Sequence, residues 1–208
     1  MLIDPVLEKV NDYIELISGL GVTLKLAVDT HTHADHITAL GELRDRLACA
    51  TMVGAESHAD CATHRFLDGD KINVGHASIQ VIHTPGHTDD SYSFYLRGDM
   101  ENAGKLFTGD TLLIRGTGRT DFQNGDAHLQ YKSLHEKLLT LPDETEVYPG
   151  HDYRGWTQSS IGEERQFNSR LHIHNADAYA KFMSKLALPT PKLMDIAVPR
   201  NQSCGKSL

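Results

Sequence analysis

The sequence predicts a single layered α/β domain. Its 208 residues can build one core of ordinary size, or one domain with a small appendage, but not two full domains. Segments with the pattern of strands alternate with segments of helical period, which is typical of sheets covered by helices. The chain holds no internal repeat, low-complexity tract or linker. We therefore expect one domain over residues 1–208, with a short helical or extended segment over about 160–208 at its end.

Helices and strands are expected to alternate through the first half of the chain. Apolar residues from Val6 to Ile17 recur at helical spacing, after Pro5 and before two glycines. A β-branched segment over residues 22–28 predicts a strand, and residues 29–35 are polar and prone to turn. The remaining expected elements are a helix with its buried face at Ile37, Leu40, Leu43 and Leu47, a strand over 51–54, a helix over 55–64 and a strand over 78–83.

The same alternation continues in the second half. Strands are expected over 91–96 and 105–108, joined by the polar turn 97–104. Residues 115–126 are rich in glycine and show no period, and a loop of that length in a compact domain is usually functional or disordered. The pattern then predicts a helix over 127–139, a strand over 146–148, helices over 161–170 and 176–186, and an extended, proline-punctuated tail from Pro189.

Charge and hydropathy exclude several classes of protein. The formal net charge is −8, and no run of basic residues could neutralise a phosphate backbone, so nucleic acid is not expected as a partner. No apolar stretch approaches the roughly 18 residues of a membrane span, so a transmembrane protein is not expected. Residues 1–5 have neither the basic start of a secretion signal nor the composition of a transit peptide.

The three cysteines indicate a reducing compartment. Cys49, Cys61 and Cys204 are an odd number at scattered spacings, with no C-x-x-C pair. This spacing predicts neither a disulfide framework nor a zinc ribbon. We therefore expect a cytoplasmic protein.

Histidine is the unusual residue, because the chain contains 13 of them and neutral imidazole is the commonest metal ligand. The segment His31-Thr32-His33-Ala34-Asp35-His36 places three imidazoles and a carboxylate between a predicted strand and a predicted helix. His31 and His33 leave the strand on the same side, because side chains alternate, and Asp35 and His36 can turn back toward them. This segment is a cluster of candidate metal ligands.

Three further candidates each follow a predicted strand and a glycine. They are His87 after Gly86, Asp110 after Gly109 and His151 after Gly150. Glycine allows the backbone to turn so that the next side chain faces a cleft. Four loops that all end in ligand residues are not expected by accident, so a metal site is the better interpretation. The other eight histidines are interpreted as structural: His58, His64, His76, His83, His128, His135, His172 and His174.

These ligands resemble those of the metallo-β-lactamase superfamily, whose H-x-H-x-D-H signature and later His, Asp and His match in identity and order. The resemblance implies a four-layer αββα sandwich with the metal cleft at one edge. It does not fix the reaction, because many activities share this scaffold. The first strands of that fold precede Ile3-Asp4-Pro5 in the family, so the chain is expected to lack them, and an uncovered sheet edge would invite pairing with another chain.

A closer resemblance, over nearly the whole chain, is to the persulfide dioxygenases, which are related to glyoxalase II. It is carried by residues 107–125, by Ile3-Asp4-Pro5-Val6, by residues 29–40, by residues 148–153 and by the tail 195–199. The resemblance implies oxidation of glutathione persulfide by O2 to sulfite and glutathione, as part of sulfide detoxification. It also implies one Fe(II) per subunit, held by His31, His87 and Asp110, and a homodimer.

The ligand list leaves a second possibility open. A dinuclear zinc hydrolase resembling glyoxalase II, a hydroxyacylglutathione hydrolase, would use all seven candidates and attack a thioester with bound hydroxide. In the oxygenase, the four extra residues would instead orient the ligands and the substrate by hydrogen bonds. These four are His33, Asp35, His36 and His151. A third possibility is a non-catalytic sulfur carrier or sensor that uses Cys49, Cys61 or Cys204, although none of them lies in a motif.

Glutathione requires positive charge for its carboxylates. Arg119, on the loop after Asp110, is the best placed candidate, followed by Arg115 and Tyr153. The alternative is that Arg115 and Arg119 pair with Asp121 or Asp126 and hold this loop in place.

Overall fold

The computed structural model describes residues 1–186 and 188–206, which fall into two compact units. The first unit comprises Met1–Phe66 and Leu188–Leu208, and the second comprises Leu67–Ala187. Each unit has its own hydrophobic cluster. Within the described residues, no helix is both long and apolar enough to cross a membrane. The expectation of one domain over residues 1–208 stays a prediction.

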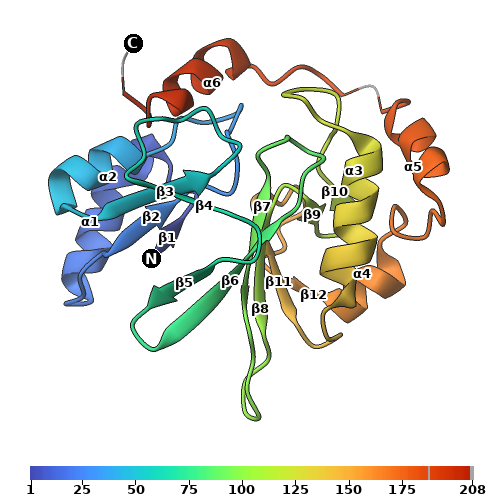
Figure 1. The fold of residues 1–208 in the computed structure, drawn as a ribbon, viewed down its shortest axis with the longest axis horizontal. Coiled ribbons are helices and arrows are strands. Elements are labelled where there is room, and N and C mark those ends of the chain that lie inside the picture. The colour runs from blue at the N-terminus through green and yellow to red at the C-terminus, as the bar shows by residue number, and fades with distance from the viewer. Residues whose placement is uncertain (187, 207–208) are drawn as a thin grey trace. The chain divides into compact units, whose positions relative to one another are not determined.

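The first unit is built on a four-stranded sheet in which every neighbouring pair is parallel. Its order is β1 (Leu2–Ile3), β2 (Leu26–Val28), β3 (Ala50–Gly54) and β4 (His64–Phe66). All three residues of β2 are buried, as expected for a central parallel strand covered on both faces. The helices of this unit are η1 (Leu7–Lys9), α1 (Val10–Gly19), α2 (Leu40–Leu47) and α6 (Met194–Gln202), and Figure 1 shows α1 and α2 beside the sheet.

The helix expected over residues 55–64 is absent, and this prediction is wrong. The segment forms a turn that leads into β4. The guanidinium of Arg65 donates to the carbonyl oxygens of Gly54 and Ser57, at 3.2 and 2.5 Å, and to Asp60 at 2.8 Å. These bonds satisfy the carbonyl groups that a helix would have used, so the turn replaces the helix.

The extended tail expected from Pro189 is also wrong, because residues 194–202 form α6 in spite of Pro199. Proline in a helix removes one backbone hydrogen bond. Tertiary contacts offset this loss, since Ala197 and Asn201 are buried in the first unit. The prediction failed because it weighed the prolines and not the burial of this face.

The cysteine spacing predicts no disulfide framework, and it does not reveal the single disulfide of the structure. Cys61 and Cys204 form a disulfide in the first unit, although 143 residues separate them in the sequence. No local motif marks such a pair, because the fold and not the spacing brings the two cysteines together. Cys49 is free and buried.

The second unit contains a six-stranded sheet. Its strands, in spatial order, are β12 (Ser159–Ser160), β11 (Glu146–Pro149), β8 (Lys105–Gly109), β7 (Tyr92–Leu96), β6 (Ala77–His83) and β5 (Lys71–Val74). The pair β11 and β8 is parallel and the other pairs are antiparallel. A two-stranded antiparallel ladder pairs β9 (Leu112–Leu113) with β10 (Gly116–Thr117), and β10 falls at the start of the segment predicted as a glycine-rich loop.

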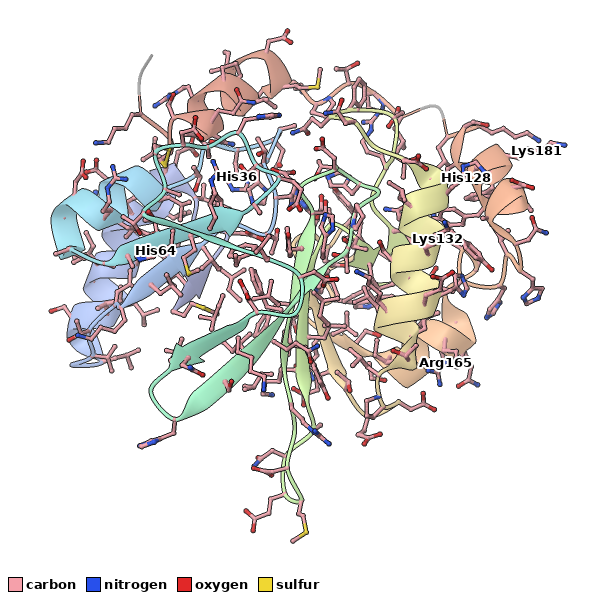
Figure 2. All side chains as sticks on the ribbon, in the orientation of Figure 1. His36, His64, His128, Lys132, Arg165 and Lys181 are labelled. Carbon is pink, nitrogen blue, oxygen red and sulfur yellow. A yellow bond between two sulfur atoms is a disulfide. The ribbon has the colours of Figure 1, made fainter. Side chains whose placement is uncertain are left out.

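Helices α3 (Ala127–Lys132), α4 (Ile161–Phe167) and α5 (Ala176–Met183) gather on one side of this sheet (Figure 1). The helix predicted over 127–139 is α3 followed by a π-helical turn η2 (Ser133–Lys137) and a 3-10 turn η3 (Leu138–Thr140). Asp126 begins α3 by accepting hydrogen bonds from the backbone of His128 and Leu129. His128 of α3 contacts Asp177 of α5 at 3.1 Å, and Figure 2 labels His128 and Lys132 on α3 and Lys181 on α5.

Candidate metal centre

In the first unit, the candidate ligands lie on the loop that joins β2 to α2. His31 and His33 are buried there, with ring centroids 4.1 Å apart, and the ring of His36 lies 4.2 Å from that of His33. Figure 2 labels His36 on this loop. Asp35 lies beside His36, with 3.1 Å between its Oδ2 and the Nδ1 of the imidazole. The loop therefore gathers its three imidazoles and its carboxylate, as the sequence predicted.

Asp4 is a partner of this loop that the sequence analysis did not single out as a site residue. Its Oδ1 lies 3.1 Å from the Nε2 of His33 and accepts a hydrogen bond of 2.6 Å from the backbone N–H of Thr30. Burial lowers the pKa of His33, but the charge and hydrogen bonding of Asp4, together with the charges of Asp29 and Asp35, raise it to about 9. The only signal in the sequence was that Asp4 belongs to a segment matched by the resemblance.

Apart from Nε2 of His33, which lies 3.1 Å from Asp4 Oδ1, two buried ring nitrogens of the loop have no hydrogen-bond partner among the described residues: Nδ1 of His33 and Nε2 of His36. Buried polar atoms are normally paired, so such atoms indicate a different kind of partner. One ligand atom from each of His33, Asp35 and His36 lies within 4.8 Å of the others, and the same holds for Asp4, Asp29 and His33. Imidazole and carboxylate bind zinc and iron, so these residues fit a metal ion.

The pair of Asp4 and His33 predicts a pH-dependent stability of the metal-free protein. The folded pKa of His33, about 9, lies above its ordinary value of 6.5, so its contribution to stability is complete below the ordinary value. That contribution is lost as the pH rises through the folded pKa. We expect the free energy of unfolding, measured with urea and a chelator, to fall between about pH 7 and about pH 10. Asp4→Asn should show a smaller fall, and an equal fall in the variant would contradict this explanation.

In the second unit, the candidate ligands follow three strands of the sheet. Asp110 is the first residue after β8 and His151 is the second residue after β11. The carboxyl ends of these parallel neighbours meet at one edge of the sheet. The Nδ1 of His151 lies 2.8 Å from Asp110 Oδ1, and the Nε2 of His87 lies 3.6 Å from Asp110 Oδ2. The structure thus brings together the three predicted ligands of this unit.

The tautomer and position of the His87 ring are fixed by a hydrogen bond to the backbone of the loop after Asp110. Its Nδ1 donates to the carbonyl oxygen of Arg119 at 2.7 Å, so the other nitrogen, Nε2, faces Asp110 without the proton in the neutral ring. A Cβ atom at Gly118 would lie 2.9 Å from the Nδ1 of His87 and 2.0 Å from the carbonyl oxygen of Asp110. A Cβ at Gly150 would lie 2.9 Å from Asp110 Oδ1. Both glycines therefore allow a close packing of backbone around the candidate ligands, which fits a metal site.

The predicted substrate residues lie in different environments. The Nε of Arg119 donates to Asp121 at 2.7 Å, and the guanidinium lies 4.3 Å from the centroid of the Phe122 ring. Its pairing with Asp121 is the one that the sequence analysis gave as an alternative. Tyr153 is 80% exposed and stacks on His151 with 5.9 Å between ring centroids.

Arg115 forms its ion pairs with the two carboxylates of α4, Glu163 and Glu164, and not with the loop carboxylates that the sequence suggested. Its backbone N–H donates to Glu164 at 2.7 Å, and its guanidinium forms an ion pair with the same carboxylate, which is 0% exposed. A weaker contact of 3.4 Å reaches Glu163. Glu164 could not be identified from the sequence, because nothing in the helix pattern of 161–170 marks a buried carboxylate. Arg115 therefore holds the loop after Asp110 to α4.

The fold and the ligands define a member of the metallo-β-lactamase superfamily, and a model of this superfamily matches residues 1–151. Within it, the chain belongs to the persulfide dioxygenase family. The human protein "Persulfide dioxygenase ETHE1, mitochondrial" is 45% identical over 206 residues, which cover 99% of this chain and 79% of the relative. The mixed α/β fold predicted from the sequence is thereby confirmed as the metallo-β-lactamase fold.

Two solved structures extend the comparison. The crystal structure of ETHE1 from Myxococcus xanthus is 48% identical, with a TM-score of 0.93, and the match covers 98% of this chain and 88% of that chain. The crystal structure of TTHA1623 in a di-iron-bound form is 26% identical, with a TM-score of 0.67, over 80% of this chain and 87% of that chain. A metal site in this chain is thus supported by its family and by its own donors.

Proposed function

We propose that the chain is a mononuclear non-haem iron dioxygenase that oxidises glutathione persulfide with O2 to sulfite and glutathione. The observation that carries this proposal is the 45% identity to a persulfide dioxygenase over 99% of the chain. The balance of atoms requires one water besides O2, because sulfite contains three oxygen atoms and O2 supplies two. The persulfide S–S bond breaks, its terminal sulfur is oxidised, and the inner sulfur leaves as the thiol of glutathione.

We assign His31, His87 and Asp110 as the ligands of one Fe(II). Two imidazoles and one carboxylate are the donor set of non-haem iron oxygenases, and they leave coordination positions open. When bound there, iron would hold the persulfide sulfur and O2 next to each other. The protein's own contribution is orientation: the carbonyl of Arg119 fixes the ring of His87, and the ring of His151 holds the carboxylate of Asp110.

A second candidate function is a dinuclear zinc hydroxyacylglutathione hydrolase. It is favoured by the first unit, where His33, Asp35 and His36 fit a metal ion. The rings of His33 and His36 each carry a buried nitrogen without a hydrogen-bond partner among the described residues. This hydrolase would place His31, His33, His87 and Asp110 on one zinc, and Asp35, His36, Asp110 and His151 on the other.

Metal analysis and a thioester assay separate the two functions. The protein would be purified from cells supplied with equal iron and zinc, its metals counted by mass spectrometry, and its hydrolysis of S-lactoylglutathione measured. The dioxygenase predicts close to one iron per chain and no hydrolysis. Two zinc ions per chain together with rapid hydrolysis would establish the hydrolase instead.

Arg119 is proposed to bind a carboxylate of the glutathione moiety, and Arg119→Ala tests this role. Loss of a charge-assisted hydrogen bond costs about 1.5–3 kcal/mol, which is roughly a 10- to 100-fold effect, expected mainly in KM. The control is Asp121→Asn, which removes the charge that Arg119 contacts at 2.7 Å but keeps the guanidinium. An unchanged KM in Arg119→Ala would remove this residue from the binding site.

A further inference from the structure

We propose that Asn201 is a positioning residue for the metal centre, because its side-chain amide fixes the backbone of the loop that carries His31, His33 and His36. The inference rests on the proposed metal-binding role of this loop. Asn201 lies on α6, more than 160 residues further along the chain, and its amide reaches the loop at three points with sequence separations of 163, 165 and 168 residues. All of these residues belong to the first unit.

The amide of Asn201 is bonded to the loop through both of its ends. Its Nδ2 donates to the carbonyl oxygen of His33 at 2.8 Å and to that of His36 at 2.9 Å. Its Oδ1 accepts from the backbone N–H of Thr38 at 2.8 Å. A primary amide offers two N–H donors and one acceptor oxygen, so this one side chain uses its whole donor capacity on the loop. Asn201 is 4% exposed, so water does not compete for these bonds.

The loop needs such a partner because residues 32–36 belong to neither strand nor helix. Buried backbone groups that have no partner in regular structure cost free energy unless a side chain or water binds them. The two carbonyl groups that Asn201 binds belong to His33 and His36, which are themselves candidate ligands. Holding these backbone positions therefore limits where the imidazoles can point.

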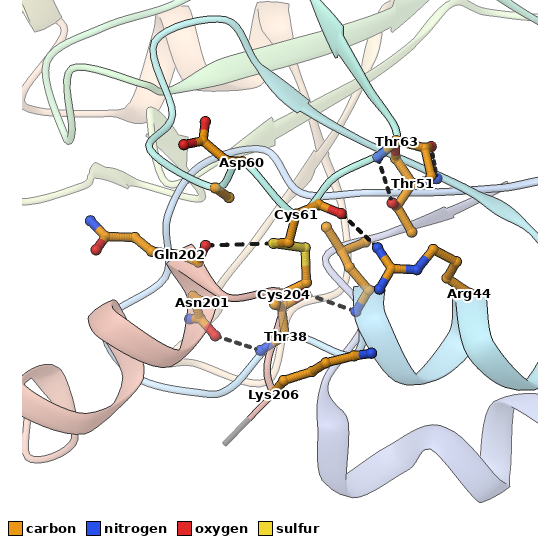
Figure 3. The surroundings of a disulfide bond; sticks show 12 residues. Thr38, Arg44, Thr51, Asp60, Cys61, Thr63, Asn201, Gln202, Cys204 and Lys206 are labelled. Atoms are coloured by element: carbon orange, nitrogen blue, oxygen red, sulfur yellow. Dashed lines mark hydrogen bonds between the residues drawn. A yellow bond between two sulfur atoms is a disulfide. The ribbon is translucent and has the colours of Figure 1, made fainter. Parts of the chain in front are cut away.

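The position of Asn201 is in turn fixed by the chain around Cys204 (Figure 3). The disulfide joins Cys204 to Cys61, and the carbonyl oxygen of Cys204 accepts a hydrogen bond of 3.0 Å from the backbone N–H of Gly41. A Cβ atom at Gly41 would lie 2.7 Å from that carbonyl oxygen, and a Cβ at Gly205 would lie 2.0 Å from the carbonyl oxygen of Thr38. Glycine at both positions permits the close approach that brings the amide to the loop.

The test is a titration of metal-free protein with Co(II), followed by visible absorption, with thermal unfolding measured in parallel. Asn201→Ala is expected to bind Co(II) roughly 10- to 100-fold more weakly than the wild type, as for other hydrogen-bond partners of metal ligands. Wild-type affinity in folded Asn201→Ala would overturn the proposal. Binding of Co(II) is independent of persulfide oxidation, so a wild type that binds metal but lacks activity would contradict the proposed function and not this inference.

The matched control is Asn168→Ala in the second unit. Asn168 is also buried, and its amide donates to the carbonyl oxygen of Gly116 and to Glu164, both at 2.9 Å. Its loss should lower the unfolding temperature as much as the loss of Asn201, while the affinity for Co(II) stays within about 2-fold. If Asn201→Ala and Asn168→Ala lost the same affinity for Co(II), the loss would follow from lower stability alone, and the proposal would be overturned.

Asn201→Asp covers the case in which Asn201→Ala does not fold. This variant has nearly the same shape and keeps the acceptor for Thr38 but lacks the two donors, so a 10- to 100-fold loss, roughly, is again expected. If neither variant folds, the proposal is tested by amide hydrogen exchange of the wild-type protein with and without Co(II). Co(II) binding should slow exchange at the amide of Thr38, because coupling between two sites is reciprocal. Unchanged exchange there would contradict the proposal.

Discussion

His31→Ala is expected to remove the bound iron and the oxidation of glutathione persulfide together, with kcat/KM lower by at least about 10³-fold. A site with two imidazoles and one carboxylate has no spare ligand, so the loss of one imidazole removes a third of the protein donors. Iron is counted by mass spectrometry and turnover by O2 consumption.

The control for this prediction is His76→Ala. His76 is exposed and lies in the turn between β5 and β6, and it belongs to the histidines interpreted as structural. The iron content and turnover of this variant should equal those of the wild type. If His31→Ala retained its iron, His31 would not be a ligand.

Glu164→Ala is expected to lower the free energy of unfolding by about 3–5 kcal/mol, because removal of one partner leaves the other charge of a buried ion pair uncompensated. Glu164 is 0% exposed and accepts hydrogen bonds from the backbone of Arg115 at 2.7 Å and from Ser159 Oγ at 2.7 Å, besides its ion pair with the guanidinium. Arg115 also has a φ of +56°, a left-handed conformation that the bonds from α4 help to hold.

The neighbouring carboxylate is a matched control. Glu163 contacts Arg115 at 3.4 Å and its side chain is 51% exposed, so Glu163→Ala should cost less than about 1 kcal/mol. Urea unfolding of the metal-free proteins measures both values. Similar losses in the two variants would contradict the account of a buried ion pair.

The regular elements could be predicted where the hydrophobic pattern is local. The strand expected over 78–83 is β6 (Ala77–His83), and the strand over 105–108 is β8 (Lys105–Gly109). The helix over 55–64 could not be excluded from its composition, because the side chain of Arg65 and its bonds to the preceding turn decide the structure there. Helix α6 depends on the burial of Asn201, which no local pattern reports.

The residues of the candidate site also divide into those that a local sequence pattern predicts and those that it does not. His87, Asp110 and His151 could be predicted because each follows the end of a strand, and paired strands bring their ends together. Asp4, Glu164 and Asn201 could not be predicted, since each acts across a long sequence separation. The proposed cytoplasmic location and homodimer stay predictions.

The cysteines bear on the sulfur-carrier alternative. Cys61 and Cys204 are joined in a disulfide, and Cys49 is buried, with a pKa that burial raises above its ordinary value. Among the described residues, no cysteine is therefore an exposed free thiol. This arrangement disfavours a carrier that holds sulfur on a thiolate.

The most direct test of the central claim is O2 uptake by protein loaded anaerobically with Fe(II), on addition of glutathione persulfide. The account predicts rapid uptake with one sulfite formed for each O2 consumed. The thermal unfolding curve and the iron content of the same sample show that it is folded and loaded. Absence of uptake from such a sample would contradict the dioxygenase and favour the thioester hydrolase.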